Sequence, residues 1–271
     1  MTLQYKDSRL QRMGAILLRF YYLYKNSWPR LIEMSYWPVF QIITWGFLTL
    51  HLSAGNSTWV EQAFGVLLAG ALLWEVLMRS QIGYALSFLE EMWSKNLGHL
   101  FVSPLRFYEW IGALSILTFI RTFVGIFPAM LIALFLYHYS IFDMGVPLVF
   151  FYSSLVFTGI WMSLIAQAII LRYGLGAESF AWMIAFAISP ISCVFYPLEV
   201  LPTWLQPFAL ALPTTYCFEG MRDILVDNYV NWKDIGLSYA LNLVYFSLCI
   251  LYLNYTFKKI RETGNLLQYG E

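Results

Sequence analysis

Residues 195–222 of this chain read FYPLEVLPTWLQPFALALPTTYCFEGMR. The stretch holds four of the chain's ten prolines, at positions 197, 202, 207 and 213. A membrane-spanning helix tolerates proline poorly, because neighbouring groups must satisfy the backbone carbonyl that proline leaves free. The stretch is also rich in Trp, Phe and Leu, so it is poorly suited to bulk water. We therefore expect a re-entrant segment over residues 197–213, made of short helices that dip into the membrane and turn back.

The composition of the whole chain indicates an integral membrane protein. Hydrophobic residues make up 60% of the chain and charged residues 12%, and the mean hydropathy is +0.63. Soluble domains carry about twice that share of charge. Residues 1–271 therefore predict a single all-α transmembrane domain, with no separate soluble domain.

A crossing needs about 20 mainly apolar residues. Upstream of the first such segment, residues 1–31 mix Arg and Lys with Leu, Tyr and Trp, which predicts an interfacial helix lying along the membrane surface. The fifth apolar segment is short and contains Pro190, so we expect it to bend. Six spans are predicted, at residues 34–53, 63–88, 110–137, 146–171, 180–196 and 235–257.

The distribution of Lys and Arg predicts the orientation. With a cytoplasmic N-terminus, twelve of these residues fall on the cytoplasmic side, and only Arg222 and Lys233 fall outside. Cytoplasmic loops of membrane proteins carry such an excess of positive charge. Both termini are therefore expected in the cytoplasm, and the re-entrant segment is expected to enter from the outside.

The loop after the second predicted span forms a second distinctive block, LEEMWSKNLGHLFVSPL at residues 89–105. Its polar and apolar residues alternate at helical spacing, which predicts a short amphipathic helix ending before Pro104. The simplest interpretation is an interfacial helix that rests on lipid.

Together with the block SPISCVFYPLEVLPTWLQPFALALPTTYCFEGMR at residues 189–222, this loop resembles the permeases of the ABC-2 transporter family. The resemblance covers nearly the whole chain and implies a half-transporter in a bacterial plasma (inner) membrane. It implies three partners besides membrane lipid: a second copy of the chain and two ABC ATPase subunits. Residues 89–104 would then be the coupling helix that binds the ATPase, through Glu90, Glu91, Trp93, Leu97, Leu100 and Phe101.

The chain itself carries no motif for ATP chemistry. It has no Gly-rich phosphate loop with its Lys, and its three His residues show no metal-ligand spacing. We therefore expect no enzyme activity, no metal site, no cofactor bound by this chain and no nucleic-acid partner. ATP and Mg²⁺ are expected on the partner ATPase.

Three charged residues fall inside predicted spans: Glu75, Arg79 and Arg121. Counting along each span places Glu75 and Arg121 near the bilayer centre. Charges within a membrane are costly and are usually paired. Glu75 can pair with Arg79 one helical turn away, or with Arg121 on the next span. Either pair can fix helix packing, or the charges can form part of a substrate path.

Aromatic residues suggest further contacts with a substrate. By the family resemblance, Trp37, Phe40, Gln41 and Phe195 contact the substrate, whereas packing and an interfacial aromatic belt are the simpler explanation. Within the re-entrant segment, an outer gate is expected to be plugged by Trp204, Leu205 and Phe208. The alternative is that these three side chains only anchor the segment among lipid headgroups.

The functional prediction is an ATP-driven exporter of an amphipathic compound, such as a drug-like molecule or a lipid. Export of a polysaccharide or lipid-linked glycan is the alternative within this class, because aromatic faces also bind sugars. A non-transporting membrane scaffold is the alternative from another class, although a scaffold has no need of a coupling helix. A neighbouring gene with an ATP-binding motif favours transport, and neighbouring glycosyltransferase genes favour glycan export.

Overall fold

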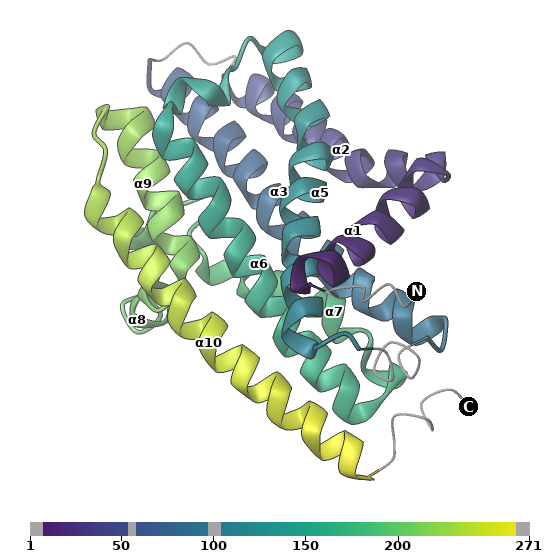
Figure 1. Ribbon diagram of the computed structural model, residues 1–271. Coiled ribbons are helices and arrows are strands. Elements are labelled where there is room, and N and C mark those ends of the chain that lie inside the picture. The colour runs from purple at the N-terminus through teal and green to yellow at the C-terminus, as the bar shows by residue number, and fades with distance from the viewer. Residues whose placement is uncertain (1–7, 54–57, 97–103, 264–271) are drawn as a thin grey trace.

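The computed structural model describes residues 8–53, 58–96 and 104–263, and these residues form helices and no strands. Figure 1 shows α9 and α10 on one side of the molecule, α1 and α2 on the other, and α3, α5 and α6 between them. The long helices are α1 (Arg9–Lys25), α2 (Trp28–Ser53), α3 (Thr58–Trp93), α5 (Phe107–Tyr137), α6 (Val146–Tyr173), α9 (Pro213–Asp227) and α10 (Trp232–Thr263).

Short helices connect the long ones. α7 has only nine residues, a rise of about 13 Å, so it is too short to cross a membrane alone. The single fifth span predicted over residues 180–196 is therefore divided, and the chain passes through a left-handed residue at Cys193. The short helices are η1 (Ile141–Met144), η2 (Leu175–Ala177), α7 (Phe180–Ile188), η3 (Ser189–Ile191), η4 (Leu198–Val200) and α8 (Gln206–Leu210).

Within the described part of the chain, four helices are long and apolar enough to cross a membrane: Phe64–Trp93, Phe107–Tyr137, Val146–Tyr173 and Trp232–Ile260. They correspond to the second, third, fourth and sixth predicted spans. The first predicted span forms most of α2, whose 26 residues extend for about 39 Å. The structure thus supports an all-helical membrane protein with at least these four long apolar helices.

Local sequence explains where several helices begin and end. Ser8 and Gln11 form a reciprocal capping box at the start of α1, which satisfies backbone N–H groups left free there. α6 follows Gly145, whose φ of 61° favours glycine. α9 begins at Pro213, a position where proline's missing N–H costs nothing.

Close packing and buried polar contacts join the central helices. Gly159 of α6 lies against Ser80 and Gln81 of α3, so the two helices approach closely. α6 and α10 are joined by Asn242, whose side-chain oxygen accepts hydrogen bonds of 2.9 Å from both Thr158 and Trp161. Small residues and hydrogen-bonded polar side chains commonly hold membrane helices together.

One expected segment differs from the structure. Residues 89–93 do not start a separate helix; they continue α3, which ends at Trp93 because the chain turns through a left-handed Lys95. α1 packs along the first half of α5, and its place at the membrane surface stays a prediction. Its Arg12 binds Glu109 near the start of α5, and its Tyr24 lies against Arg121.

Candidate functional site

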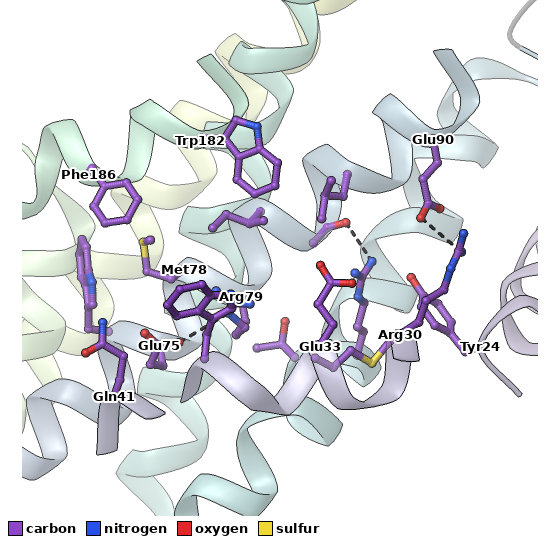
Figure 2. Close-up of a pocket in the computed structure, with 18 of the residues that line it drawn as sticks. Tyr24, Arg30, Glu33, Gln41, Glu75, Met78, Arg79, Glu90, Trp182 and Phe186 are labelled. Carbon is purple, nitrogen blue, oxygen red and sulfur yellow. Dashed lines mark hydrogen bonds and ion pairs between the residues drawn. The ribbon is translucent and has the colours of Figure 1, made fainter. Parts of the chain in front are cut away.

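A cavity of about 600 Å³ lies where α1, α2, α3, α5 and α7 meet. Its walls combine aromatic rings with six charged side chains. Figure 2 shows Tyr24, Arg30, Glu33 and Glu90 gathered at one end, with Phe186, Gln41 and Glu75 toward the other. Among the described residues, this cavity brings together more charged groups from different helices than any other site identified.

α3 supplies one wall of the cavity because its lining residues recur every three or four positions. Trp74, Met78 and Ile82 are apolar and almost fully buried, whereas Glu75 and Arg79 place charges on the same helical face. The same face reaches the end of the helix, where Glu90 and Trp93 also line the cavity.

Two ion pairs neutralise four of the cavity's charges. Glu75 Oε2 lies 3.5 Å from Arg79 Nε, one helical turn along α3, and both side chains are largely buried. Arg30 of α2 lies 3.3 Å from Glu90 of α3 and ties the start of α2 to the end of α3. The sequence allowed Glu75 either Arg79 or Arg121 as its partner, and the structure pairs it with Arg79.

Arg121 is held by neutral groups. Its Nη1 donates to the backbone carbonyl of Gly83 at 3.2 Å and to Ser87 Oγ at 3.5 Å. Its guanidinium lies 5.1 Å from the centre of the Tyr24 ring, within the range of a cation–π contact. Burial raises the pKa of the Tyr24 phenol, and the charge of Arg121 opposes that shift.

The structure brings four of the six predicted path residues to this cavity: Trp37, Gln41, Glu75 and Arg121. Phe40 does not line it and is half exposed on α2. Phe195 stacks on Trp45, with ring centres 4.5 Å apart, and also lies outside the cavity lining.

Other lining residues were not identified from the sequence: Tyr24, Arg30, Glu33, Trp182 and Phe186. One signal was available, because Glu33 is one of only two acidic residues before the first predicted span, the other being Asp7. The contribution of α7 could not be seen, since it depends on how a nine-residue helix packs against α3. Gln81 of α3 holds α7 there by donating to the carbonyl of Ala181 at 2.8 Å.

The predicted coupling residues that the structure describes all have partners within the chain. Glu90 binds Arg30, and the buried Glu91 binds Arg19 of α1 at 2.7 Å. The indole of Trp93 donates to Glu178 at 3.2 Å. Leu97, Leu100 and Phe101 lie outside the described residues.

The re-entrant segment does not form a plug within a single chain. Trp204 and Phe208 are 69% and 61% exposed, so neither fills an internal space. Leu205 is half-buried and packs against the small cluster formed by Cys193, Leu201 and Ala209. The segment is instead held from α9, where Glu219 binds the backbone N–H of Leu198 and Arg222 binds the carbonyl of Cys193 just before the segment.

The chain matches no protein-family model and no curated protein sequence. Its function has therefore to be inferred from the apolar helices, the cavity and the ion pairs around it. Among the described residues, no group of three His, Cys, Asp or Glu side chains is placed to hold a metal ion.

Proposed function

We propose that this chain is the permease half of an ATP-driven ABC exporter of the ABC-2 type, moving an amphipathic compound out of the cytoplasm or the inner leaflet. The observation that carries the proposal is the cavity between α2, α3, α5 and α7. It offers charged groups at one end and aromatic surfaces along its length, which suits a molecule with a polar head and an apolar body.

The position of α3 supports a route for energy coupling. Residues from Trp74 to Trp93 on this helix line the cavity, and the helix then runs into the segment that we assign to ATPase binding. A shift at the end of α3 would thus act directly on the cavity wall. In this proposal, ATP binding to two partner ATPases favours one of two permease conformations, and hydrolysis restores the other.

The full proposal has six crossings, both termini in the cytoplasm of a bacterium and a second copy of the chain. α2 is long enough to be a fifth crossing. The sixth crossing would combine α7 with the segment that follows it, because broken helices are tolerated where they pack against protein. Residues 197–213 would enter from the outside, and a second copy could cover Trp204 and Phe208.

Co-expression with an ABC ATPase, chosen from any that a neighbouring gene encodes, tests the proposal. We expect the two proteins to purify together and inside-out vesicles to take up an amphipathic dye only when ATP is supplied. A catalytically inactive ATPase provides the control. A permease that binds no ATPase and supports no ATP-dependent uptake would identify a scaffold, and uptake of a lipid-linked glycan alone would favour the glycan alternative.

A further inference from the structure

One charge of each sign remains in the cavity after the two ion pairs are counted. Arg30 is paired with Glu90, and Arg79 is paired with Glu75. Arg121 and Glu33 also line the cavity, and neither forms an ion pair with any residue that the structure describes. A ligand that carries both a negative and a positive group would complement these two side chains.

Arg121 has unused hydrogen-bonding capacity. A guanidinium carries five N–H donors. Both of its hydrogen bonds to described residues leave from Nη1, toward Gly83 and Ser87. The hydroxyls of Tyr24 and Thr122, which line the same cavity, are buried and have no hydrogen-bond partner among the described residues. These donors together suit a phosphate or carboxylate group.

Glu33 provides the opposite charge near the same end of the cavity. Figure 2 shows its carboxylate directed into the space between Arg79 and Arg30. Trp37 follows one helical turn later on α2 and also lines the cavity. A carboxylate with an indole ring nearby is a favourable site for an ammonium group, through charge and cation–π attraction.

The two unpaired charges lie at similar positions along the packed helices α2 and α5. A Cβ built on Gly125 of α5 would lie 2.9 Å from the carbonyl oxygen of Met34, so these two positions are level. The first predicted span begins at Met34, and Arg121 lies one turn before Gly125. Arg121 and Glu33 therefore lie within about one helical turn of each other along these two packed helices.

The rest of the cavity leads away from these charges past Gln41 and the paired Glu75 and Arg79, along side chains that are otherwise mainly apolar. Trp74 and Met78 form a buried wall on α3. Trp182 and Phe186 of α7 line the cavity while remaining 40% and 61% exposed, so the aromatic side is open at the molecular surface. An alkyl chain can enter the cavity through this aromatic opening.

We propose that the cavity binds a zwitterionic amphiphile. Its phosphate or carboxylate group binds Arg121, its ammonium group binds Glu33, and its alkyl chain lies against Trp74, Met78, Trp182 and Phe186. The assignment names the substrate class for the proposed exporter, and in that respect it rests on the proposed function. Binding itself requires only this chain.

Ligand binding by the purified chain in a neutral maltoside detergent tests the assignment without an ATPase. The probes are dodecylphosphocholine, dodecyl phosphate and phosphocholine without a chain, and the readouts are the melting temperature and the tryptophan fluorescence. We expect dodecylphosphocholine to bind most tightly. Equal binding of chain-free phosphocholine would overturn the amphiphile assignment.

Glu33→Gln is the decisive variant, because Glu33 is exposed and its replacement should leave the fold intact. We expect it to weaken dodecylphosphocholine binding about tenfold while leaving dodecyl phosphate binding unchanged or stronger, in line with the strength of charge-assisted contacts. Unchanged binding of dodecylphosphocholine would overturn the proposal. Asp143→Asn, at an exposed position outside the cavity lining, is the matched control.

Arg121→Gln should weaken both charged amphiphiles about tenfold, and Arg121→Lys should recover part of that loss by restoring the charge. Arg9→Gln, far from the cavity, is the control. Normal binding by Arg121→Gln would also overturn the proposal. If the purified chain binds the zwitterion but ATP drives no uptake in vesicles, the proposed exporter fails and the binding site stands. If ATP drives uptake but substitution of Glu33 and Arg121 does not change ligand binding, the binding site fails and the proposed exporter stands.

Discussion

Arg222 Nη2 donates a 2.6 Å hydrogen bond to the backbone carbonyl of Cys193, and the same side chain forms an ion pair with Glu219 at 2.9 Å. Glu219 in turn accepts from the backbone N–H of Leu198 at 2.7 Å. The Glu-Gly-x-Arg sequence of α9 thus holds the chain on both sides of the first proline of the re-entrant segment. Its role within this chain is to satisfy backbone groups that the broken helix leaves free.

Replacing Arg222 should therefore destabilise the re-entrant segment. Arg222→Gln removes the ion pair and leaves the carbonyls of Cys193 and Val194 without their donors, at a cost of about 1–3 kcal/mol. The expected result is a lower melting temperature in detergent, with faster proteolysis within residues 197–213. Lys233→Gln, an exposed change on the same predicted side, should alter neither. Equal stability of both variants would contradict this clamp, which consists of Glu219, Arg222 and the backbone groups that they bind.

Double-mutant cycles should distinguish the two possible partners of Glu75. The 75/79 cycle should show a coupling energy of about 0.5 kcal/mol or more, because these charges lie 3.5 Å apart. The 75/121 cycle should show less, because Arg121 binds the carbonyl of Gly83 instead. Stability in detergent of the Gln variants is the measurement. Stronger coupling between 75 and 121 would show that the helix register differs from the one described.

Gly159 should tolerate no larger residue. A Cβ at this position would lie 2.0 Å from Ser80 Oγ and 2.7 Å from the backbone nitrogen of Gln81, and the backbone atom cannot easily move away. Gly159→Ala should cost about 1–3 kcal/mol through overpacking between α3 and α6. Gly14→Ala is the control: no atom lies within 4 Å of that position, and the change should be neutral or slightly stabilising. A melting temperature for Gly159→Ala equal to that of the unmodified chain would count against this helix contact.

Charge exchange tests whether Glu91 stabilises the fold of this chain. Glu91→Arg should lower the melting temperature of the isolated permease, because the buried carboxylate binds Arg19 of α1 and Asn96. The added change Arg19→Glu should recover part of the loss by restoring an ion pair. The recovery should be modest, since Arg19 is half exposed and solvent screens the charge. If Glu91 acts only at an ATPase surface, the single variant will melt like the unmodified chain.

A pH dependence is expected at the acidic end of α9. Burial raises the pKa of Asp223 above its ordinary value of about 3.9, with added repulsion from Asp234, Glu219 and Asp227. The folded state therefore binds the proton of the Asp223 carboxyl group more tightly than the unfolded state does. This proton binding stabilises the fold at low pH, and the stabilisation is lost as pH rises through the pKa of the folded state. Asp223→Asn should melt higher than the unmodified chain at pH 7, and the difference should shrink near pH 3. Glu199→Gln should show no such gain in melting temperature. If Asp223→Asn also shows no gain at pH 7, the effect is ruled out.

The long helices could be predicted because their signal is local. Continuous apolar runs identified α3, α5, α6 and α10 within a few residues, and Pro190 predicted the break after α7. The end of α3 was harder to predict from the sequence. Residues 89–93 have a helical pattern in either case, and only tertiary contacts such as Glu91 with Arg19 show that they continue the preceding helix.

The cavity could be predicted only in part. Glu75 and Arg121 were identified because charges are rare within apolar runs, and Trp37 and Gln41 because the resemblance placed them on a path. Glu33 was missed because it lies before the predicted span, where a charge needs no explanation. Its relation to Arg121 depends on how α2 packs against α5, and no local pattern in either helix records that register.

The clamp on the re-entrant segment is complete within a short part of the chain. Cys193 and Arg222 are 29 positions apart, and no described side chain of α10 takes part in the contacts of Glu219 and Arg222 with residues 193–198. α7 alone is too short to partition into lipid as a transmembrane helix. The broken helix is therefore completed by its own C-terminal neighbour in the chain, so residues 180–227 have the contacts of one local folding unit.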